Sequence, residues 1–242
     1  MISSGFFAMT NSGNRKIYKD IYHLTGTIKP IIWYIMLTKK QLMLLKPFQG
    51  ANIAREYGVR ELARASKEKS NNAMQLALKQ FIQEKIVTQR KVGTSKLYRI
   101  NLSNNLSYNY LELIKFEGLP KEVISSVEAL MNEVDKHDLF YSLAIFGSYA
   151  IGKQEKKSDL DIAVFIPNKS FEQNVKIASN MAKTSALLQL HVHIITADDF
   201  FEMLINKQAN VGKEIARKHR VIYNSPIFYK IINKALSHGF QF

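Results

Sequence analysis

Residues 141–167 read YSLAIFGSYAIGKQEKKSDLDIAVFIP and are more informative than the rest of the chain. The first apolar run of this stretch ends in a Gly-Ser pair, and Asp159-Leu160-Asp161 then opens a second apolar run. Because side chains alternate between the two faces of a strand, we expect both aspartates on one side, roughly 7 Å apart along the chain, and Leu160 in a core. Two carboxylates placed in this way can share a pair of divalent cations for in-line displacement at phosphorus.

The Gly-Ser pair is Gly147-Ser148, ten residues ahead of the first aspartate. A glycine lets the backbone approach a ligand closely, and Ser148 offers a hydroxyl and an N–H at a strand-to-helix turn, where anions are bound well. The alternative is that the aspartates only cap a strand and face water. A strand cap does not require the preceding Gly-Ser, so the combined pattern favours a site.

Gly147-Ser148, ten residues and then Asp159-x-Asp161 resembles the signature of the DNA polymerase beta-type nucleotidyltransferase superfamily, and the small size resembles its minimal branch. The resemblance implies that Gly147 and Ser148 hold a triphosphate, from ATP or another NTP, and that Asp159 and Asp161 are catalytic residues and metal ligands. Hard oxygen ligands favour Mg²⁺ or Mn²⁺ over zinc. Lys153, in the intervening loop, could contact phosphate or be an ordinary solvated lysine.

One strand departs from the family pattern. Members of the superfamily usually carry a third acidic residue on a later strand, but residues 188–195 read LQLHVHII. The aligned position holds His191, and His193 faces the same way two residues later. A histidine could accept a proton or ligate a softer metal, and the pair could equally be structural.

The composition bears on the cellular location of the protein and on the kinds of site that it can contain. The 242 residues include no cysteine, which excludes disulfides and thiolate zinc sites and fits a reducing, cytoplasmic location. The early apolar run 31–37 is too short to span a bilayer, so we expect no membrane association. Residues 1–35 carry no motif, and we expect them to form an extension ahead of the first domain.

Positive charge is concentrated near the N-terminus. The formal net charge is +14, and within residues 36–110, 14 lysines and arginines stand against 4 glutamates and no aspartate. Such a concentration points to nucleic acid or another polyanion as partner. A lysine-rich solvated surface is the alternative.

The same basic segment has the pattern of a winged helix-turn-helix domain. Helical spacing of apolar residues predicts three helices and then two strands joined around Gly93: 38–48, 59–65, 71–82, 86–90 and 96–100. The resemblance implies binding to duplex DNA, with base-edge contacts from Ser70, Asn71, Asn72 and Gln75 and phosphate contacts from Lys69, Lys79, Arg90, Lys91 and Lys96. A winged helix can also serve dimerisation or substrate docking, because fold alone does not fix function.

The expected fold class is α+β. We expect an extension, a winged helix-turn-helix domain, a linker helix and a nucleotidyltransferase domain with a C-terminal helix, over 1–35, 36–104, 105–119 and 120–242. In the last domain, strands and helices alternate and predict a small mixed sheet flanked by helices. The strands are expected at 140–146, 161–166, 190–195 and 221–223, and the helices at 120–136, 171–188, 198–206 and 226–238.

Two functional hypotheses remain open. The first is an Mg²⁺-dependent nucleotidyltransferase that moves AMP from ATP to a hydroxyl of a small molecule, a nucleic acid or a protein, such as the HEPN-type toxin partnered by minimal nucleotidyltransferase antitoxins. The second is a DNA-binding transcriptional regulator whose nucleotidyltransferase-like domain is catalytically weak, inactive or senses nucleotides. The basic winged helix and the absent third acid both favour it. Winged-helix proteins are often dimers, so a homodimer is a further expectation.

Overall fold

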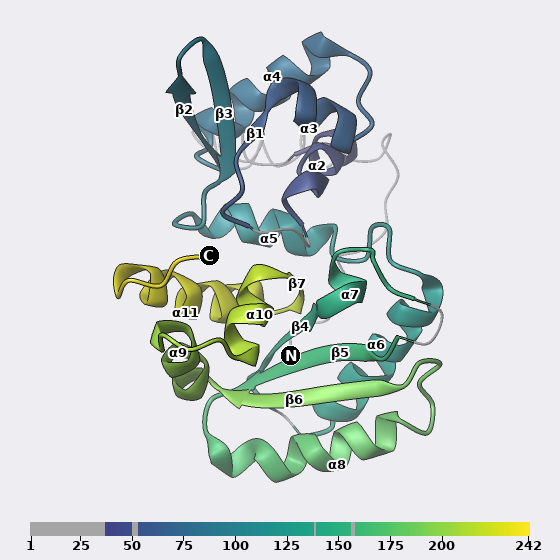
Figure 1. Cartoon of the computed structure of the whole chain (residues 1–242). Coiled ribbons are helices and arrows are strands. Elements are labelled where there is room, and N and C mark those ends of the chain that lie inside the picture. The colour runs from purple at the N-terminus through teal and green to yellow at the C-terminus, as the bar shows by residue number, and fades with distance from the viewer. Residues whose placement is uncertain (1–36, 50–52, 138, 156–157) are drawn as a thin grey trace, which may run out of the picture. The chain divides into compact units, whose positions relative to one another are not determined.

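The computed structural model describes residues 37–49, 53–137, 139–155 and 158–242 (Figure 1). Contacts divide the chain into two units, Met1–Leu37 and Thr38–Phe242, and every element below belongs to the second. The extension expected at 1–35 lies outside the described residues. Among those described, no helix is long and apolar enough to cross a membrane.

The first expected helix is divided in two. Helix α2 (Lys39–Leu44) begins at Thr38, whose side chain forms a capping box with Gln41. A short 3₁₀ helix, η2 (Lys46–Phe48), follows. The prediction of one helix over 38–48 is therefore wrong, because Pro47 has no N–H and its ring would clash with the preceding helical turn. Helix α3 (Val59–Ala65) has the expected bounds.

Helix α4 (Asn71–Gln83) begins at Ser70, whose hydroxyl accepts a hydrogen bond from the Ala73 N–H (3.2 Å). An apolar stripe of this helix is buried at Met74, Ala77, Leu78 and Phe81. Ile82, beside this stripe, is 37% exposed. At about 100° of rotation per residue, it lies at the margin of the stripe rather than in its centre.

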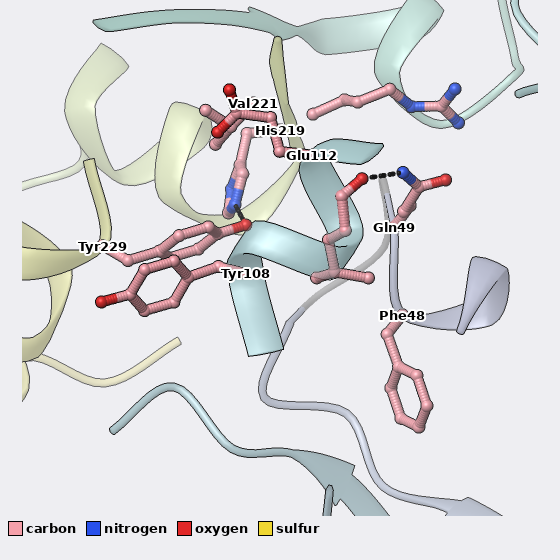
Figure 2. A pocket seen from close by; sticks show the side chains of 9 residues that line it. Phe48, Gln49, Tyr108, Glu112, His219, Val221 and Tyr229 are labelled. Carbon is pink, nitrogen blue, oxygen red and sulfur yellow. Dashed lines mark hydrogen bonds between the residues drawn. The ribbon is translucent and has the colours of Figure 1, made fainter. Parts of the chain in front are cut away.

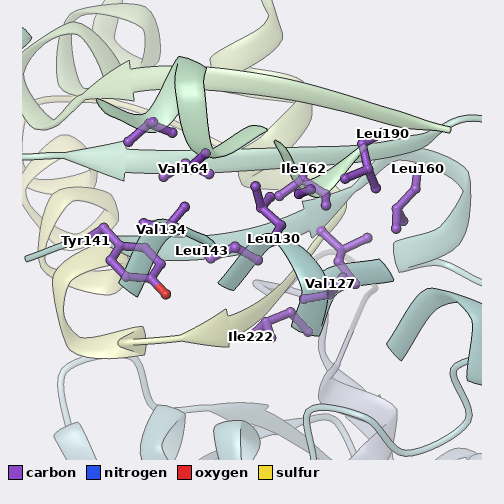
Figure 3. Close-up of a cluster of buried hydrophobic side chains, with 14 of the residues drawn as sticks. Val127, Leu130, Val134, Tyr141, Leu143, Leu160, Ile162, Val164, Leu190 and Ile222 are labelled. Atoms are coloured by element: carbon purple, nitrogen blue, oxygen red, sulfur yellow. The ribbon is translucent and has the colours of Figure 1, made fainter. Parts of the chain in front are cut away.

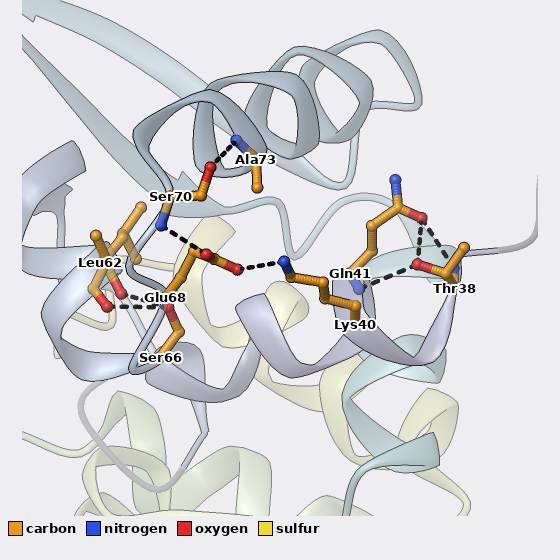
Figure 4. A network of polar contacts seen from close by, with 9 residues as sticks. Thr38, Lys40, Gln41, Leu62, Ser66, Glu68, Ser70 and Ala73 are labelled. Carbon is orange, nitrogen blue, oxygen red and sulfur yellow. Dashed lines mark hydrogen bonds and ion pairs between the residues drawn. The ribbon is translucent and has the colours of Figure 1, made fainter.

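A polar contact joins α2 to the turn before α4 (Figure 4). The Glu68 carboxylate accepts from the Ser70 N–H (2.7 Å) and pairs with the Lys40 Nζ (3.1 Å). The Ser70 amide, followed by Lys40, lowers the pKa of Glu68. Glu68 therefore remains charged where it connects these two elements.

A three-stranded antiparallel sheet accompanies these helices. Strands β2 (Val87–Val92) and β3 (Ser95–Ile100) form the expected hairpin around Gly93. The two-residue strand β1 (Tyr57–Gly58), which the sequence did not predict, pairs with β3. Helices α3 and α4 and the hairpin lie close to their expected positions. That they constitute a winged helix-turn-helix domain stays a prediction.

The second sheet contains strands β4 (Ser142–Phe146), β5 (Leu160–Ile166), β6 (Leu190–Thr196) and β7 (His219–Tyr223), in the order β6-β5-β4-β7. Strand β4 runs antiparallel to β5 and β7. Strands β5 and β6 run parallel, and helix α8 (Glu172–Ala182) makes the crossover that parallel strands require.

The two faces of this sheet are covered differently. Helices α6 (Lys121–Asp135) and α8 bury one face, where Leu160 and its neighbours form a hydrophobic core (Figure 3). On the opposite face, Phe165 packs on Phe200 of α9 (Ala197–Ile205) and on Phe228 of α11 (Ser225–Ser237). The prediction that Leu160 points into a core is confirmed, because it is fully buried.

Helix α5 (Asn105–Leu113) connects the parts that carry the two sheets. Its Glu112 carboxylate accepts hydrogen bonds from the backbone N–H groups of Asn224 (3.1 Å) and Ser225 (2.7 Å). Tyr108 stacks on Tyr229 of α11 with ring centroids 5.0 Å apart. The Glu112 carboxylate thus satisfies two N–H groups at the start of α11. Asn224 provides no side-chain cap there, and its side-chain amide donates to the Tyr141 carbonyl (3.1 Å) instead.

His219 is fully enclosed beside α5 and α11 (Figure 2). Its Nδ1 lies 2.9 Å from the Ala216 carbonyl and its Nε2 3.0 Å from the Tyr229 hydroxyl. The carbonyl can only accept, so Nδ1 carries the proton and Nε2 accepts from the tyrosine. Burial lowers the pKa of His219 to about 4. The neighbouring cavity, about 10 Å³, is too small for any ligand larger than a water molecule.

Three further expectations need correction. Helix α8 ends at Ala182 rather than at residue 188, because the following residues turn back toward β6 and the Ser126 hydroxyl accepts from the N–H groups of Leu187 and Leu188. Its expected start is a 3₁₀ turn, η3 (Lys169–Phe171). The short helices α7 (Gly147–Ala150) and α10 (Val211–Arg217) were not predicted as separate elements.

Candidate functional site

The bend after β4 is built on Gly147. Its φ is +68°, a left-handed conformation that favours glycine. A Cβ at this position would lie 2.7 Å from the Asp161 Oδ2, closer than atoms can approach. Both the positive φ and the closeness of the Asp161 carboxylate favour glycine here. The bend brings the backbone at the end of β4 against a carboxylate of β5.

Asp161 is the second residue of β5, half-buried on the sheet face opposite Leu160. The parallel register sets it directly across from His191 of β6. The His191 Nδ1 lies 3.0 Å from the Asp161 Oδ1, with the imidazole largely exposed. The strand pairing thus positions both groups without help from any loop.

His193 completes a cluster on the same face. Its ring centroid lies 4.4 Å from that of His191 and 5.2 Å from that of Phe146. Burial, followed by the neighbouring His191, lowers the pKa of His193, which favours its neutral form. One ligand atom from each of Asp161, His191 and His193 lies within 4.8 Å of the other two. Three potential metal ligands therefore converge here.

Asp159, the other expected metal ligand, immediately precedes β5 and is exposed. It does not belong to the three-residue cluster that holds Asp161, within the part of the chain that the structure describes. The structure thus brings together one aspartate and two histidines. The sequence pattern predicted two aspartates as the metal ligands. The role of Asp159 as a ligand stays a prediction.

Hydrogen bonds hold the loop between the Gly-Ser bend and β5. The Tyr149 hydroxyl donates to the Ser158 carbonyl (3.3 Å), and the Glu155 N–H donates to the Ser158 hydroxyl (2.8 Å). The Lys153 N–H donates to the Ser148 carbonyl (2.9 Å), while the Lys153 side chain is exposed. The backbone of Lys153 thus has a structural role, and its ammonium group stays accessible to an anion.

The residues expected to contact DNA lie on α4, just before its start (Lys69 and Ser70) and on the hairpin. Asn71, Asn72, Gln75 and Lys79 are exposed on α4, and Lys91 pairs across the hairpin with Lys96, both exposed. Ser70, an expected base reader, already uses its hydroxyl as the cap of α4.

Two features of this basic surface were not predicted. Arg90, an expected phosphate contact, donates its Nε to the Glu56 carboxylate (2.6 Å), which offsets its charge. Leu76, in the middle of the polar face of α4, is 68% exposed. This surface is therefore less uniformly polar than expected, and Arg90 is already paired with a carboxylate.

Residues 127–223 match the family model described as a nucleotidyltransferase domain. The match begins inside α6 and spans β4, the Gly-Ser bend and β5 to β7. It confirms the resemblance drawn from the sequence over these residues, which are less than half of the chain. No curated protein matches the chain.

The histidine cluster could have been found from the sequence only by aligning two strands. The alternation in LHVHII places His191 and His193 on one face, and this was predicted. Their meeting with Asp161 depends on the β5–β6 register, because a shift by one residue would move both imidazoles to the opposite face of the sheet.

Proposed function

We propose that this protein is a divalent-metal-dependent nucleotidyltransferase that transfers a nucleoside monophosphate, AMP from ATP, to a hydroxyl group. The observation that carries the proposal is the Gly147 bend, which lies against the Asp161 carboxylate inside a matched nucleotidyltransferase domain. A bend without a side chain lets the backbone lie next to a carboxylate that can bind the counterion of a polyphosphate.

The residues have separable roles in this proposal. Gly147 and Ser148 hold the triphosphate through the bend, and the exposed Lys153 reaches the phosphates. Asp159 and Asp161 supply oxygen ligands for a divalent cation, of which Mg²⁺ fits such ligands. The cation, when bound, neutralises charge on the phosphates while the acceptor hydroxyl displaces pyrophosphate. The two histidines beside Asp161 do not fit a magnesium ligand set.

The test is transfer of label from α-³²P-ATP to candidate acceptors: a HEPN-type toxin, small hydroxyl compounds and RNA. We expect labelling that requires a divalent cation and is lost in D161N, a substitution of nearly equal shape. Retention of folding in D161N is checked by thermal unfolding. Labelling that persists in the D159A/D161A double variant refutes the assigned site.

A second function, duplex DNA binding, is supported by exposed amide and lysine side chains on α4 and the hairpin. Phosphate contacts release counterions, so the affinity should fall steeply between 50 and 200 mM salt. We expect K91Q and K96Q each to reduce the slope of log affinity against log salt by about one. K207Q, which removes an exposed lysine in the nucleotidyltransferase domain, is the matched control. A wild-type affinity independent of salt eliminates this function.

A further inference from the structure

We propose that Asp161, His191 and His193 form a binding site for a transition-metal ion of the Zn²⁺ class, in preference to Mg²⁺. The inference concerns the ion at the proposed active site and so deepens the proposed function. It departs from an all-carboxylate site, because two of the three converging side chains are imidazoles.

The distances fit one ion of this size. Zn²⁺ binds histidine nitrogen and carboxylate oxygen at about 2.0–2.2 Å, so two ligand atoms on one tetrahedral ion lie roughly 3.3 Å apart. The His191 Nδ1 and the Asp161 Oδ1 are already 3.0 Å apart. The ligand atoms of all three side chains lie within 4.8 Å of one another.

Two paired strands carry the three ligands. Asp161 and His191 are neighbours in register on β5 and β6, and His193 follows on the same face opposite Ala163. The alanine has no bulk to displace the imidazole above it. Ligands on paired strands hold their geometry better than ligands on loops, which favours selection of one ion.

The donor chemistry separates the two classes of ion. Mg²⁺ prefers oxygen ligands in near-octahedral geometry and keeps several waters. Imidazole nitrogen suits zinc, copper, nickel and iron instead. Three protein ligands also leave a position open for water or a phosphate oxygen, as catalytic zinc sites do. The cluster therefore suits an ion that is bound in place and still accessible to substrate.

The experiment measures Zn²⁺ and Mg²⁺ binding to the full chain without nucleotide, by calorimetry and by competition with a chromophoric zinc indicator. We expect one Zn²⁺ per chain, bound at least 100-fold more tightly than Mg²⁺. H191Q and H193Q should each weaken Zn²⁺ binding at least tenfold. H238Q, which changes an exposed histidine at the end of α11, should leave it unchanged.

A reverse substitution tests the ligand chemistry directly. H191D replaces an exposed imidazole with a carboxylate, and we expect it to tighten Mg²⁺ binding and narrow the preference for Zn²⁺ by tenfold or more. Thermal unfolding checks that each variant folds. Because the His191 side chain is 61% exposed, its variants should fold even if H193Q does not.

The outcomes separate this inference from the proposed function. Zn²⁺ binding that is equal in wild type, H191Q and H193Q, or within tenfold of Mg²⁺ binding, overturns the metal site and marks the histidine pair as structural. Labelled transfer that needs Asp161 would then still support the proposed function. Zn²⁺ binding that is lost in H191Q, without transfer to any acceptor, supports the metal site and counts against the transferase.

Discussion

At the scale of single residues, Gly147 is the position where conformation and site chemistry coincide. Alanine there must adopt φ +68°, at a cost of about 1–2 kcal/mol, and its Cβ would push the Asp161 carboxylate away. We therefore expect G147A to lower the free energy of unfolding by that amount and to lose metal binding and nucleotidyl transfer at least tenfold. Denaturant unfolding, calorimetry and label transfer measure the three effects.

Gly152 provides a matched control for this prediction. Its φ is +69°, but none of the residues that the structure describes has an atom within 4 Å of the place where its Cβ would stand. G152A should therefore cost similar stability and leave metal binding and transfer intact. If both variants lose activity equally, backbone strain in the loop explains the effect and contact with Asp161 does not.

His219 makes stability depend on pH. Its pKa falls from 6.5 to about 4 on folding because burial disfavours the charged form. Below pH 6.5 the unfolded chain binds a proton at this histidine, whereas the folded chain does not bind it until the pH nears 4. The contribution of His219 to the free energy of unfolding is therefore complete above pH 6.5 and is lost as the pH falls to 4. The loss from this residue is about 3 kcal/mol.

The measurement is the free energy of unfolding in urea at several pH values between 4 and 7. H219Q cannot take up the proton, so its stability should fall less steeply over this range, although it is less stable than wild type at pH 7. H238Q should keep the wild-type slope because His238 is exposed. An unchanged slope in H219Q would assign the acid sensitivity to other groups.

At the scale of elements, sequence patterns found the strands and amphipathic helices but not the short connections. The buried residues of α6 follow helical spacing because one face of that helix packs on the sheet. Helices α7 and α10 and strand β1 are too short to show a period, so tertiary contacts determine them. The end of α8 depends on Ser126, a contact that no local pattern encodes.

Helix α11 depends on a cap from a distant part of the chain. The Glu112 carboxylate of α5 accepts both the Asn224 and Ser225 N–H groups at the start of α11. Removing a charged acceptor from two backbone donors at a helix N-terminus should cost about 2 kcal/mol. We expect E112A to show this loss in denaturant unfolding.

The control for E112A is E128A, since Glu128 is exposed in the middle of α6. Alanine is a good helix former, so E128A should change stability by less than about 0.5 kcal/mol. A loss in E112A no greater than in E128A would mean that water satisfies the start of α11 without the carboxylate.

Across the whole molecule, the sequence predicts where the site lies but not all three side chains that converge there. Gly147 and Asp161 lie in one local motif, so spacing alone brought them together. The histidines join Asp161 through pairing of strands that are 30 residues apart, which no local spacing encodes. The concentration of positive charge was likewise visible, whereas the pairing of Arg90 with Glu56 was not.

The matched segment 127–223 ends before α11, yet its sheet depends on that helix. Phe228 of α11 is fully buried against Phe165 and His219. The segment 127–223 by itself therefore lacks a helix that packs on one face of the sheet. We expect F228A to cost about 3–5 kcal/mol, and F228L, which nearly conserves volume, less than about 1.5 kcal/mol. A chain ending at residue 223 should lose cooperative thermal unfolding. Cooperative unfolding of that truncated chain, with F228A near wild type, would show that the sheet is stable without α11.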